Sequence, residues 1–187
     1  MKTPVLFAVT MLSLVAPAVA AGQEAGIHVS VQGAFGTHIN GGGDSRALSI
    51  GISPGERLEF LVSVERLHLP TEVNRYENGF SVSRRGTTTA ITGEIRFTPF
   101  TFNRVRPYVL GGAGAGTARL NVNDFFPDPI TRDAVLMLVG AGIRVPVTGH
   151  LSAFADFRCV LQIDSGETGE TGMFGFLPVR GGLAWRF

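Results

Sequence analysis

LPVRGGLAWRF, residues 177–187, gives the clearest indication of how this chain folds. Every second residue counted back from Phe187 is apolar or glycine and includes Trp185, whereas the residues between them are small or cationic and include Arg180 and Arg186. Successive side chains of a β-strand point to opposite faces, so the pattern predicts a strand with one apolar and one polar face. Aromatic residues end the apolar face, as is typical of a membrane interface. We therefore interpret residues 177–187 as the closing strand of a transmembrane β-barrel.

The rest of the chain alternates in the same way, and no long stretch has helical spacing. Further strands are predicted at about 26–39, 47–53, 57–69, 88–98, 106–120, 133–145 and 150–163, although glycines leave the two faces of the fifth strand undecided. The connections after the second, fourth and sixth strands are short, and the others are longer or more polar. Outer-membrane barrels have an even number of antiparallel strands, short periplasmic turns and longer outer loops. The sequence therefore predicts an all-β fold, an eight-stranded antiparallel up-and-down transmembrane β-barrel.

Residues 1–20 have the pattern of a secretory signal peptide. Lys2 precedes an apolar run over residues 5–15, and Ala18-Val19-Ala20 forms a small-residue cleavage site. We expect cleavage after Ala20 and a mature barrel domain over residues 21–187. The chain has 16 Lys+Arg and 15 Asp+Glu, so removal of Lys2 leaves 15 of each. A neutral mature chain gives no electrostatic reason to expect nucleic acid as a partner.

The polar faces of the predicted strands carry several charged residues. If these faces contacted lipid, each arginine near the midplane would cost about 2–4 kcal/mol. The sum exceeds the usual stability of a domain, about 5–15 kcal/mol, so the charges are predicted to point into the lumen. Side chains about fill the interior of an eight-stranded barrel, and arginine pairs well with carboxylates. We therefore expect ion pairs that close the lumen, formed among Glu59, Glu94, Arg96, Arg144, Asp156, Arg158, Arg180 and Arg186. Which arginine meets which acid depends on the stagger of the strands, which the sequence leaves open.

These features together resemble a known family. A signal peptide, alternating strands, Arg106-Pro107-Tyr108 at the start of a glycine-rich strand and Leu183–Phe187 at the end are similar to the small outer-membrane β-barrels, which include the OmpA transmembrane domain, OmpX and opacity-type adhesins. The resemblance implies the outer membrane of a Gram-negative-type bacterium as the location. It also implies that the barrel-assembly machinery recognises the closing strand through Trp185 and Phe187. Gly181 departs from the larger apolar residue that is usual at its position.

Other motifs do not predict an active site. Residues 111–116 are glycine-rich but fit neither a dinucleotide-binding nor a P-loop pattern, and we interpret them as allowing a strand to pack closely or bend. The four histidines lack ligand spacing, so we expect neither a metal nor a cofactor. His150-Leu151-Ser152 is similar to the His-x-Ser pair of outer-membrane lipid A deacylases. Its parity matches that of Asp156 and faces the lumen, away from that lipid, so we expect no catalytic residues.

Three hypotheses for the function follow from the predicted barrel in outer-membrane lipid. The first is a non-enzymatic structural or surface-interaction protein whose loops, residues 70–87 and 121–132, bind a surface polysaccharide or another protein. Three arginines in the first loop and two phenylalanines in the second suit binding: Arg75, Arg84, Arg85, Phe125 and Phe126. The alternatives are a narrow pore for small solutes and, less favoured, a lipid A-modifying membrane enzyme.

Overall fold

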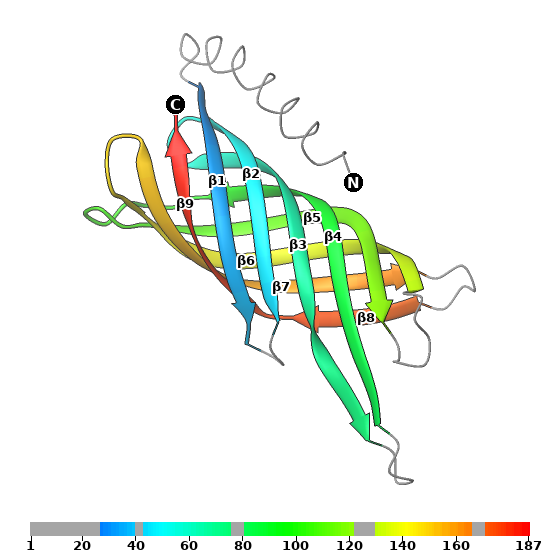
Figure 1. Ribbon diagram of the computed structural model, residues 1–187. Helices are drawn as coiled ribbons and strands as arrows, with labels where there is room; N and C mark the ends of the chain where they lie inside the picture. The colour runs from blue at the N-terminus through cyan, green and yellow to red at the C-terminus, as the bar shows by residue number, and fades with distance from the viewer. Residues whose placement is uncertain (1–26, 40–42, 76–80, 122–129, 166–170) are drawn as a thin grey trace.

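The computed structural model describes residues 27–39, 43–75, 81–121, 130–165 and 171–187, and these residues form one antiparallel sheet (Figure 1). Its strands are β1 (Ile27–His38), β2 (Asp44–Pro54), β3 (Leu58–Arg75), β4 (Ser81–Phe97), β5 (Arg106–Asn121), β6 (Ile130–Pro146), β7 (Leu151–Ser165), β8 (Thr171–Phe176) and β9 (Pro178–Arg186). Neighbours run in the order β6-β5-β4-β3-β2-β1-β9-β7-β8, and β6 also pairs with β7, which closes the sheet into a barrel. Because β8 and β9 follow each other and both pair with β7, they act as one strand of the barrel. The predicted eight-stranded antiparallel barrel is confirmed.

The largest difference from the prediction is the β3–β4 hairpin. Residues 70–87 are predicted to be a loop, but β3 continues to Arg75 and β4 begins at Ser81. The pairing is irregular around Pro70, which has no amide hydrogen to donate. The prediction is wrong because backbone hydrogen bonds hold two strands together without an apolar face, so the ladder continues after the alternation ends. Figure 1 shows this hairpin projecting beyond the rest of the barrel.

Other strands are also longer than predicted. β2 begins at Asp44 and not at residue 47, and the closing strand begins at Thr171 and not at residue 177. β5 and β6 both extend into the predicted loop 121–132. Residues near these strand ends are polar or glycine-rich, so the alternation typical of a lipid-facing strand fades before the strand itself ends.

The two ends of the barrel differ. One end, here called the terminal end, holds the start of β1, the end of β9 and the short connections β2–β3, β4–β5 and β6–β7 (Figure 1). The opposite end, here called the loop end, carries the other connections, including that of the long β3–β4 hairpin. Gly55 at φ 88° and Asn103 at φ 52° form tight turns at the terminal end, and both residue types tolerate this left-handed conformation. The predicted cleavage site at Ala18 and Ala20 lies outside the described residues.

The outside of the barrel is apolar. Outward-facing side chains remain exposed even when they are large, with Val139 at 62% and Leu48 at 58%. The exposed set includes Phe35, Leu48, Phe60, Val62, Ile91, Ile95, Val109, Val135, Met137, Val139, Phe157, Leu183 and Trp185. The described residues contain no helix that is long and apolar enough to span a membrane. An apolar exterior of this extent is suited to contact with lipid and unsuited to water.

The strands are staggered, which decides which lumenal side chains meet. Hydrogen-bonded neighbours lead from Phe35 around the barrel through Arg46, Arg66, Thr89, Thr117, Asp133 and Ser165 to Thr171. On its other side Phe35 pairs with Gly181 of the same closing strand, ten residues beyond Thr171. This offset of ten residues is the shear of the barrel. Side chains at one height in the lumen therefore come from positions that are displaced along their strands.

Candidate functional site in the barrel lumen

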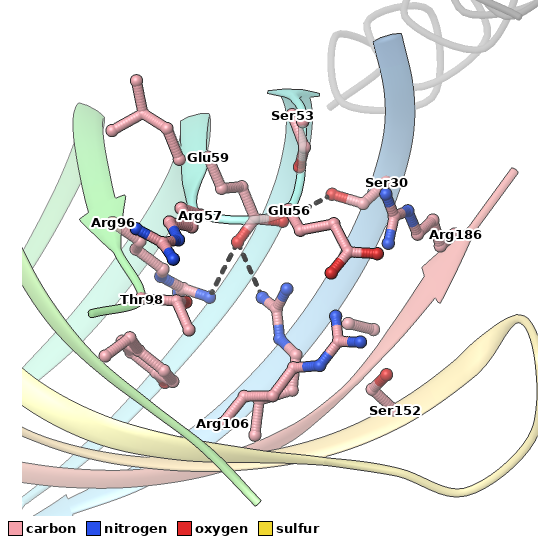
Figure 2. A pocket seen from close by; sticks show the side chains of 15 residues that line it. Ser30, Ser53, Glu56, Arg57, Glu59, Arg96, Thr98, Arg106, Ser152 and Arg186 are labelled. Atoms are coloured by element: carbon pink, nitrogen blue, oxygen red, sulfur yellow. Dashed lines mark hydrogen bonds and ion pairs between the residues drawn. The ribbon is translucent and has the colours of Figure 1, made fainter. Parts of the chain in front are cut away.

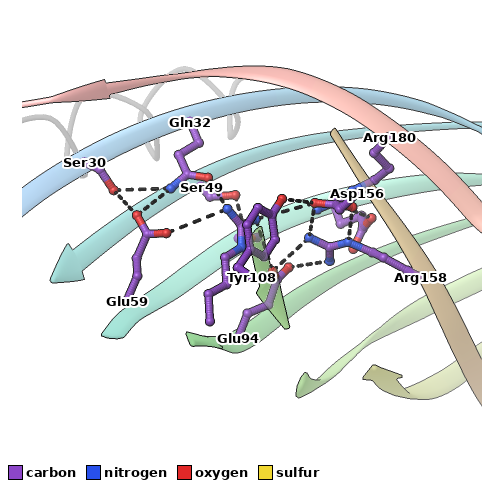
Figure 3. A network of polar contacts seen from close by, with 12 residues as sticks. Ser30, Gln32, Ser49, Glu59, Glu94, Tyr108, Asp156, Arg158 and Arg180 are labelled. Carbon is purple, nitrogen blue, oxygen red and sulfur yellow. Dashed lines mark hydrogen bonds and ion pairs between the residues drawn. The ribbon is translucent and has the colours of Figure 1, made fainter. Parts of the chain in front are cut away.

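Arg158 of β7 is the centre of a buried ion-pair network (Figure 3). Its Nη1 and Nη2 donate to the two carboxylate oxygens of Glu94 on β4, at 2.7 and 2.9 Å, and its Nε donates to Oδ1 of Asp156 at 2.7 Å. All three side chains are almost completely buried. A two-point contact between arginine and a carboxylate is strong and geometrically specific. The contact ties β4 to β7, two strands that are not neighbours in the sheet.

Arg180 of β9 extends the network across the lumen to β3. Its Nε donates to Oδ1 of Asp156 at 3.3 Å, and its Nη1 donates to Oε1 of Glu65 at 2.8 Å. Glu65 lies on the polar side of the alternation in the predicted third strand, but it is absent from the predicted set of ion-pair residues. Because Glu65 is only 2% exposed, its charge requires a buried partner, and Arg180 provides it.

Arg96 of β4 extends the network toward the terminal end. Its Nη1 donates to Oε1 of Gln32 on β1 at 2.7 Å. Its Nη2 lies 3.5 Å from a carboxylate oxygen of Glu94 and 3.9 Å from one of Asp156. The Nη1 atom also lies 3.8 Å from Glu59. Arg96 therefore lies between the central acids and a further acid nearer the terminal end.

That further acid, Glu59 of β3, accepts hydrogen bonds on both carboxylate oxygens. Its Oε1 accepts from Ser30 Oγ at 3.0 Å and from Gln32 Nε2 at 2.8 Å. Its Oε2 accepts from Arg144 Nη2 on β6 at 2.7 Å. Glu59 is buried, whereas the Arg144 side chain is 22% exposed. This pair therefore forms the boundary between the buried network and the open terminal end.

The network is electrically balanced. It joins four acids to four arginines, namely Glu59, Glu65, Glu94 and Asp156 with Arg96, Arg144, Arg158 and Arg180. Seven of the eight lumenal charges predicted from the sequence are members. The eighth, Arg186, lies at the terminal end and forms no salt bridge with a described residue. Balance matters because removing one partner of a buried pair costs about 3–5 kcal/mol.

Two aromatic rings lie against the guanidinium group of Arg96. Its guanidinium carbon lies 5.1 Å from the ring centre of Tyr108 and 5.3 Å from that of Phe154, within cation–π range. Tyr108 also donates from its hydroxyl to Asp156 at 3.1 Å. A Cβ atom on Gly142 would lie 2.6 Å from Tyr108 Cζ, and one on Gly182 would lie 2.6 Å from Phe154 Cζ. The rings therefore occupy space that only glycine leaves open on the neighbouring strands.

Buried apolar side chains, here called the apolar layer, lie beyond the network toward the loop end. Along β3, Leu67 follows Glu65 and is therefore nearer the loop end. The same holds along β7, where Val160 follows Arg158. The layer contains Leu67, Leu136, Leu138, Val160 and Phe176, and none of them is more than 3% exposed. The buried Thr88 and Gln162, joined by a 3.0 Å hydrogen bond, lie opposite Leu67 and Leu136 on the neighbouring strands. An ion passing along the lumen would have to cross this layer as well as the charges.

The two members of the His150–Ser152 pair have different surroundings. Ser152 lines a cavity at the terminal end of the lumen. The His150 ring stacks on Trp185 with ring centres 5.8 Å apart, and its Nδ1 lies 2.9 Å from the carbonyl oxygen of Arg186. The prediction that both residues face the lumen is wrong for His150, because it precedes β7 and does not follow the parity of that strand.

The two aromatic residues predicted to guide assembly lie on the outside of the barrel. Trp185 and Phe187 face outward at the terminal end and are 46% and 42% exposed. The amide of Phe187 donates to the carbonyl oxygen of Val29 at 2.9 Å, which attaches the end of β9 to β1.

Across the described ranges, no group of three or more His, Cys, Asp or Glu side chains could hold a metal ion.

A closed barrel of eight antiparallel strands, apolar outside and filled inside by charged, polar and apolar side chains, defines the class of small outer-membrane β-barrels. Solved structures of that class have the same fold. A major outer membrane protein of Thermus thermophilus superimposes with a TM-score of 0.60 at 14% identity, over 86% of this chain and 99% of that chain. Neisserial surface protein A gives a TM-score of 0.59 at 17% identity, over 87% and 97%.

A third similar structure is that of Ail, the attachment invasion locus protein of Yersinia pestis, in complex with the heparin analogue sucrose octasulfate. Its TM-score is 0.52 at 13% identity, over 86% of this chain and 98% of that chain. No family profile and no curated protein sequence matches the chain. At these identities the likeness concerns the fold, and the function has to be argued from the chain's own residues.

Proposed function

We propose that the chain is a non-enzymatic outer-membrane β-barrel of a Gram-negative-type bacterium, with a closed lumen and a surface-interaction role at its loop end. The observation that carries this proposal is the filling of the lumen. A balanced ion-pair network occupies the terminal side, and the apolar layer occupies the loop side. Side chains about fill an eight-stranded barrel, so such an interior supports displayed hairpins and leaves no path for solutes.

A narrow pore is the alternative that this lumen argues against. A passing ion would have to replace the two hydrogen bonds between Arg158 and Glu94. It would then meet the tightly buried side chains of the apolar layer, which fill the lumen toward the loop end. Single-channel recording in planar bilayers separates a closed barrel from a pore.

A lipid A-modifying enzyme has less support. Such an enzyme needs a nucleophile and a base that face the lipid together. Ser152 lines a lumenal cavity, whereas His150 stacks on the outward Trp185. We expect cells that express the chain to contain unchanged lipid A by mass spectrometry, and a loss of acyl chains would reinstate the enzyme hypothesis.

In this proposal the terminal end faces the periplasm and the loop end faces outward, because short turns face the periplasm in barrels of this class. The β3–β4 hairpin then extends from the cell. Its segment 70–87 carries Arg75, Arg84 and Arg85, and arginine suits the sulfate, phosphate or carboxylate groups of an anionic polysaccharide. Ail was solved with a sulfated sugar, a ligand of that protein and a reasonable first probe for this one.

Binding to whole cells tests the surface role. Cells that display the chain should retain heparin, and replacing Arg75, Arg84 and Arg85 together with glutamine should lower retention at least fivefold at equal surface amounts. The matched control replaces Phe125 and Phe126 with alanine in the predicted loop 121–132, which should leave heparin retention unchanged. Equal retention by cells with and without the chain would contradict a polyanion-binding role for this hairpin.

Export and assembly complete the proposal. We expect signal cleavage between Ala20 and Ala21, so N-terminal sequencing of the membrane-extracted protein should begin at Ala21. We further expect the barrel-assembly machinery to recognise Trp185 and Phe187. Deleting Phe187 should lower the folded yield, measured as the heat-modifiable band on unboiled gels, whereas Phe102→Ala in the β4–β5 turn should not. A normal folded yield without Phe187 would show that this aromatic end is not used in assembly.

A further inference from the structure

The lumen opens at the terminal end into a small cavity (Figure 2). Its volume is about 60 Å³, which is enough to hold more than one water. The charged residues of its lining come from the β2–β3 connection and from β3, β4, β5, β6 and β9, and they are Glu56, Glu59, Arg57, Arg96, Arg106, Arg144 and Arg186, of which Arg96 belongs to the ion-pair network. The cavity therefore gathers cations from distant parts of the chain around one small space.

The cations of this cavity exceed its anions. Glu59 is already engaged by Arg144, Ser30 and Gln32. Arg57, Arg106 and Arg186 form no salt bridge with any residue in the described ranges. Glu56 is the remaining acid of the lining. Three unpaired arginines and one carboxylate leave an excess of two positive charges around the cavity.

Backbone register places like charges against each other here. Arg106 of β5 lies directly opposite Arg144 of β6, and both line the cavity. Like charges directly opposite each other destabilise a sheet. In addition, the Nε atoms of Arg144 and Arg186 are buried without a hydrogen-bond acceptor. A buried donor without an acceptor is unfavourable, and an anion in the cavity would offset the repulsion between the facing arginines.

We propose that this cavity is a binding site for a phosphate group. Arginine presents several N–H donors in one plane and matches the oxygens of phosphate. A phosphate monoester carries about −1.5 to −2 charge near pH 7, which matches the excess of the cavity. Arg106 and Arg186 bind the oxygens, and Arg57 attracts the anion from the rim. The cavity is large enough for a phosphate group and is open to solvent at the terminal end.

Two sources supply a phosphate group, a soluble phosphate monoester with nearly two negative charges and the phosphodiester headgroup of an anionic phospholipid, with one, in the leaflet on the terminal side. Calorimetric titration of the full chain with inorganic phosphate, in neutral detergent micelles, tests the site itself, with chloride at equal ionic strength as the reference. Titrating the chain in nanodiscs of phosphatidylcholine and of phosphatidylglycerol then identifies the source. Loss of phosphate binding only in phosphatidylglycerol indicates the headgroup, and binding in both indicates a soluble anion.

Arg106→Gln should weaken phosphate binding at least tenfold. The matched control is Arg104→Gln, an exposed arginine in the β4–β5 turn that does not line the cavity, which should change the affinity less than twofold. If Arg106→Gln fails to fold, Arg57→Gln at the exposed rim should still weaken binding severalfold. Absence of saturable binding, or equal effects of Arg104→Gln and the cavity variants, would overturn the proposal. The site does not depend on a closed lumen, so conductance recordings leave this result unaffected.

Discussion

The ion-pair network and the terminal cavity are both rich in arginine, but their charges are arranged differently. In the network four arginines meet four acids, and most of these side chains are buried. Around the cavity, three arginines face one unpaired carboxylate and remain partly exposed. A buried charge requires a partner within the chain, whereas a partly exposed one is compensated by water and ions. The network arginines therefore stabilise the barrel, and the cavity arginines are available to a ligand.

Removing one acid from each region should give the largest contrast. Glu94→Ala leaves Arg158 without its two-point partner, and we expect a loss of about 3–5 kcal/mol in the free energy of unfolding. Glu56→Ala removes an exposed carboxylate at the cavity and should cost less than about 1 kcal/mol. Urea unfolding in neutral detergent, followed by the fluorescence of Trp185, the single tryptophan, measures both.

Equal losses for the two variants would show that the network charges are not buried and paired. A small loss for both would mean that water enters the network and replaces the missing carboxylate. Asp156→Ala provides an independent repeat, because Arg158, Arg180 and Tyr108 all contact that side chain.

Adding one methyl group beside Tyr108, where the network meets the cavity, should lower the free energy of unfolding. Tyr108 lines the cavity and also donates to Asp156 in the network. Gly142→Ala would place a Cβ 2.5 Å from the carbonyl oxygen of Ala155 and 2.6 Å from Tyr108 Cζ, and overpacking of this kind costs about 1–3 kcal/mol. Gly149→Ala in the β6–β7 turn meets nothing within 4 Å and should change the unfolding free energy by less than about 0.5 kcal/mol. Similar values for the two variants would indicate that the Tyr108 ring does not lie against β6.

The smallest expected effect has the opposite sign. Arg106→Gln removes one of two like charges that face each other across β5 and β6, so we expect stability in phosphate-free buffer to rise by about 0.2–1 kcal/mol. Arg158→Gln, the same chemical change inside the network, should instead destabilise strongly because two acids lose their main partner. Destabilisation by Arg106→Gln would show that this arginine already has a compensating partner within the chain.

The barrel and the inward direction of its charges could be predicted because a lipid-facing strand alternates strictly. One strand carries Glu94 and Arg96 on the same face, and another carries Asp156 and Arg158 on the same face. In both strands the opposite face is apolar, which indicates that the charges point into the lumen. The alternation of apolar and polar residues is missing from the sequence of segment 70–87, so the strands there could not be recognised. The same loss of pattern placed the start of the closing strand six residues too late, at residue 177 and not at Thr171.

The pairing could not be predicted because it depends on the stagger between strands. The ten-residue shear brings Arg180 beside Glu65, and no local feature of β3 or β9 indicates that contact. The uncharged residues that contact the network were not predicted for a different reason. Gln32 carries no charge to mark it, and Tyr108 lies on a glycine-rich strand whose faces the sequence leaves undecided. Gly142 of β6 lies directly opposite Tyr108, and this glycine is the one sequence feature that could have indicated that the Tyr108 ring points into the lumen.

Single-channel recording of the wild-type protein in planar bilayers tests the closed lumen most directly. The protein should first be shown to be folded by its heat-modifiable mobility. We predict no steady conductance above the bilayer baseline, because the ion-pair network and the apolar layer fill the lumen in series. Steady, reproducible single-channel steps from the folded protein would contradict a closed lumen, and the narrow pore would then replace the structural barrel as its function.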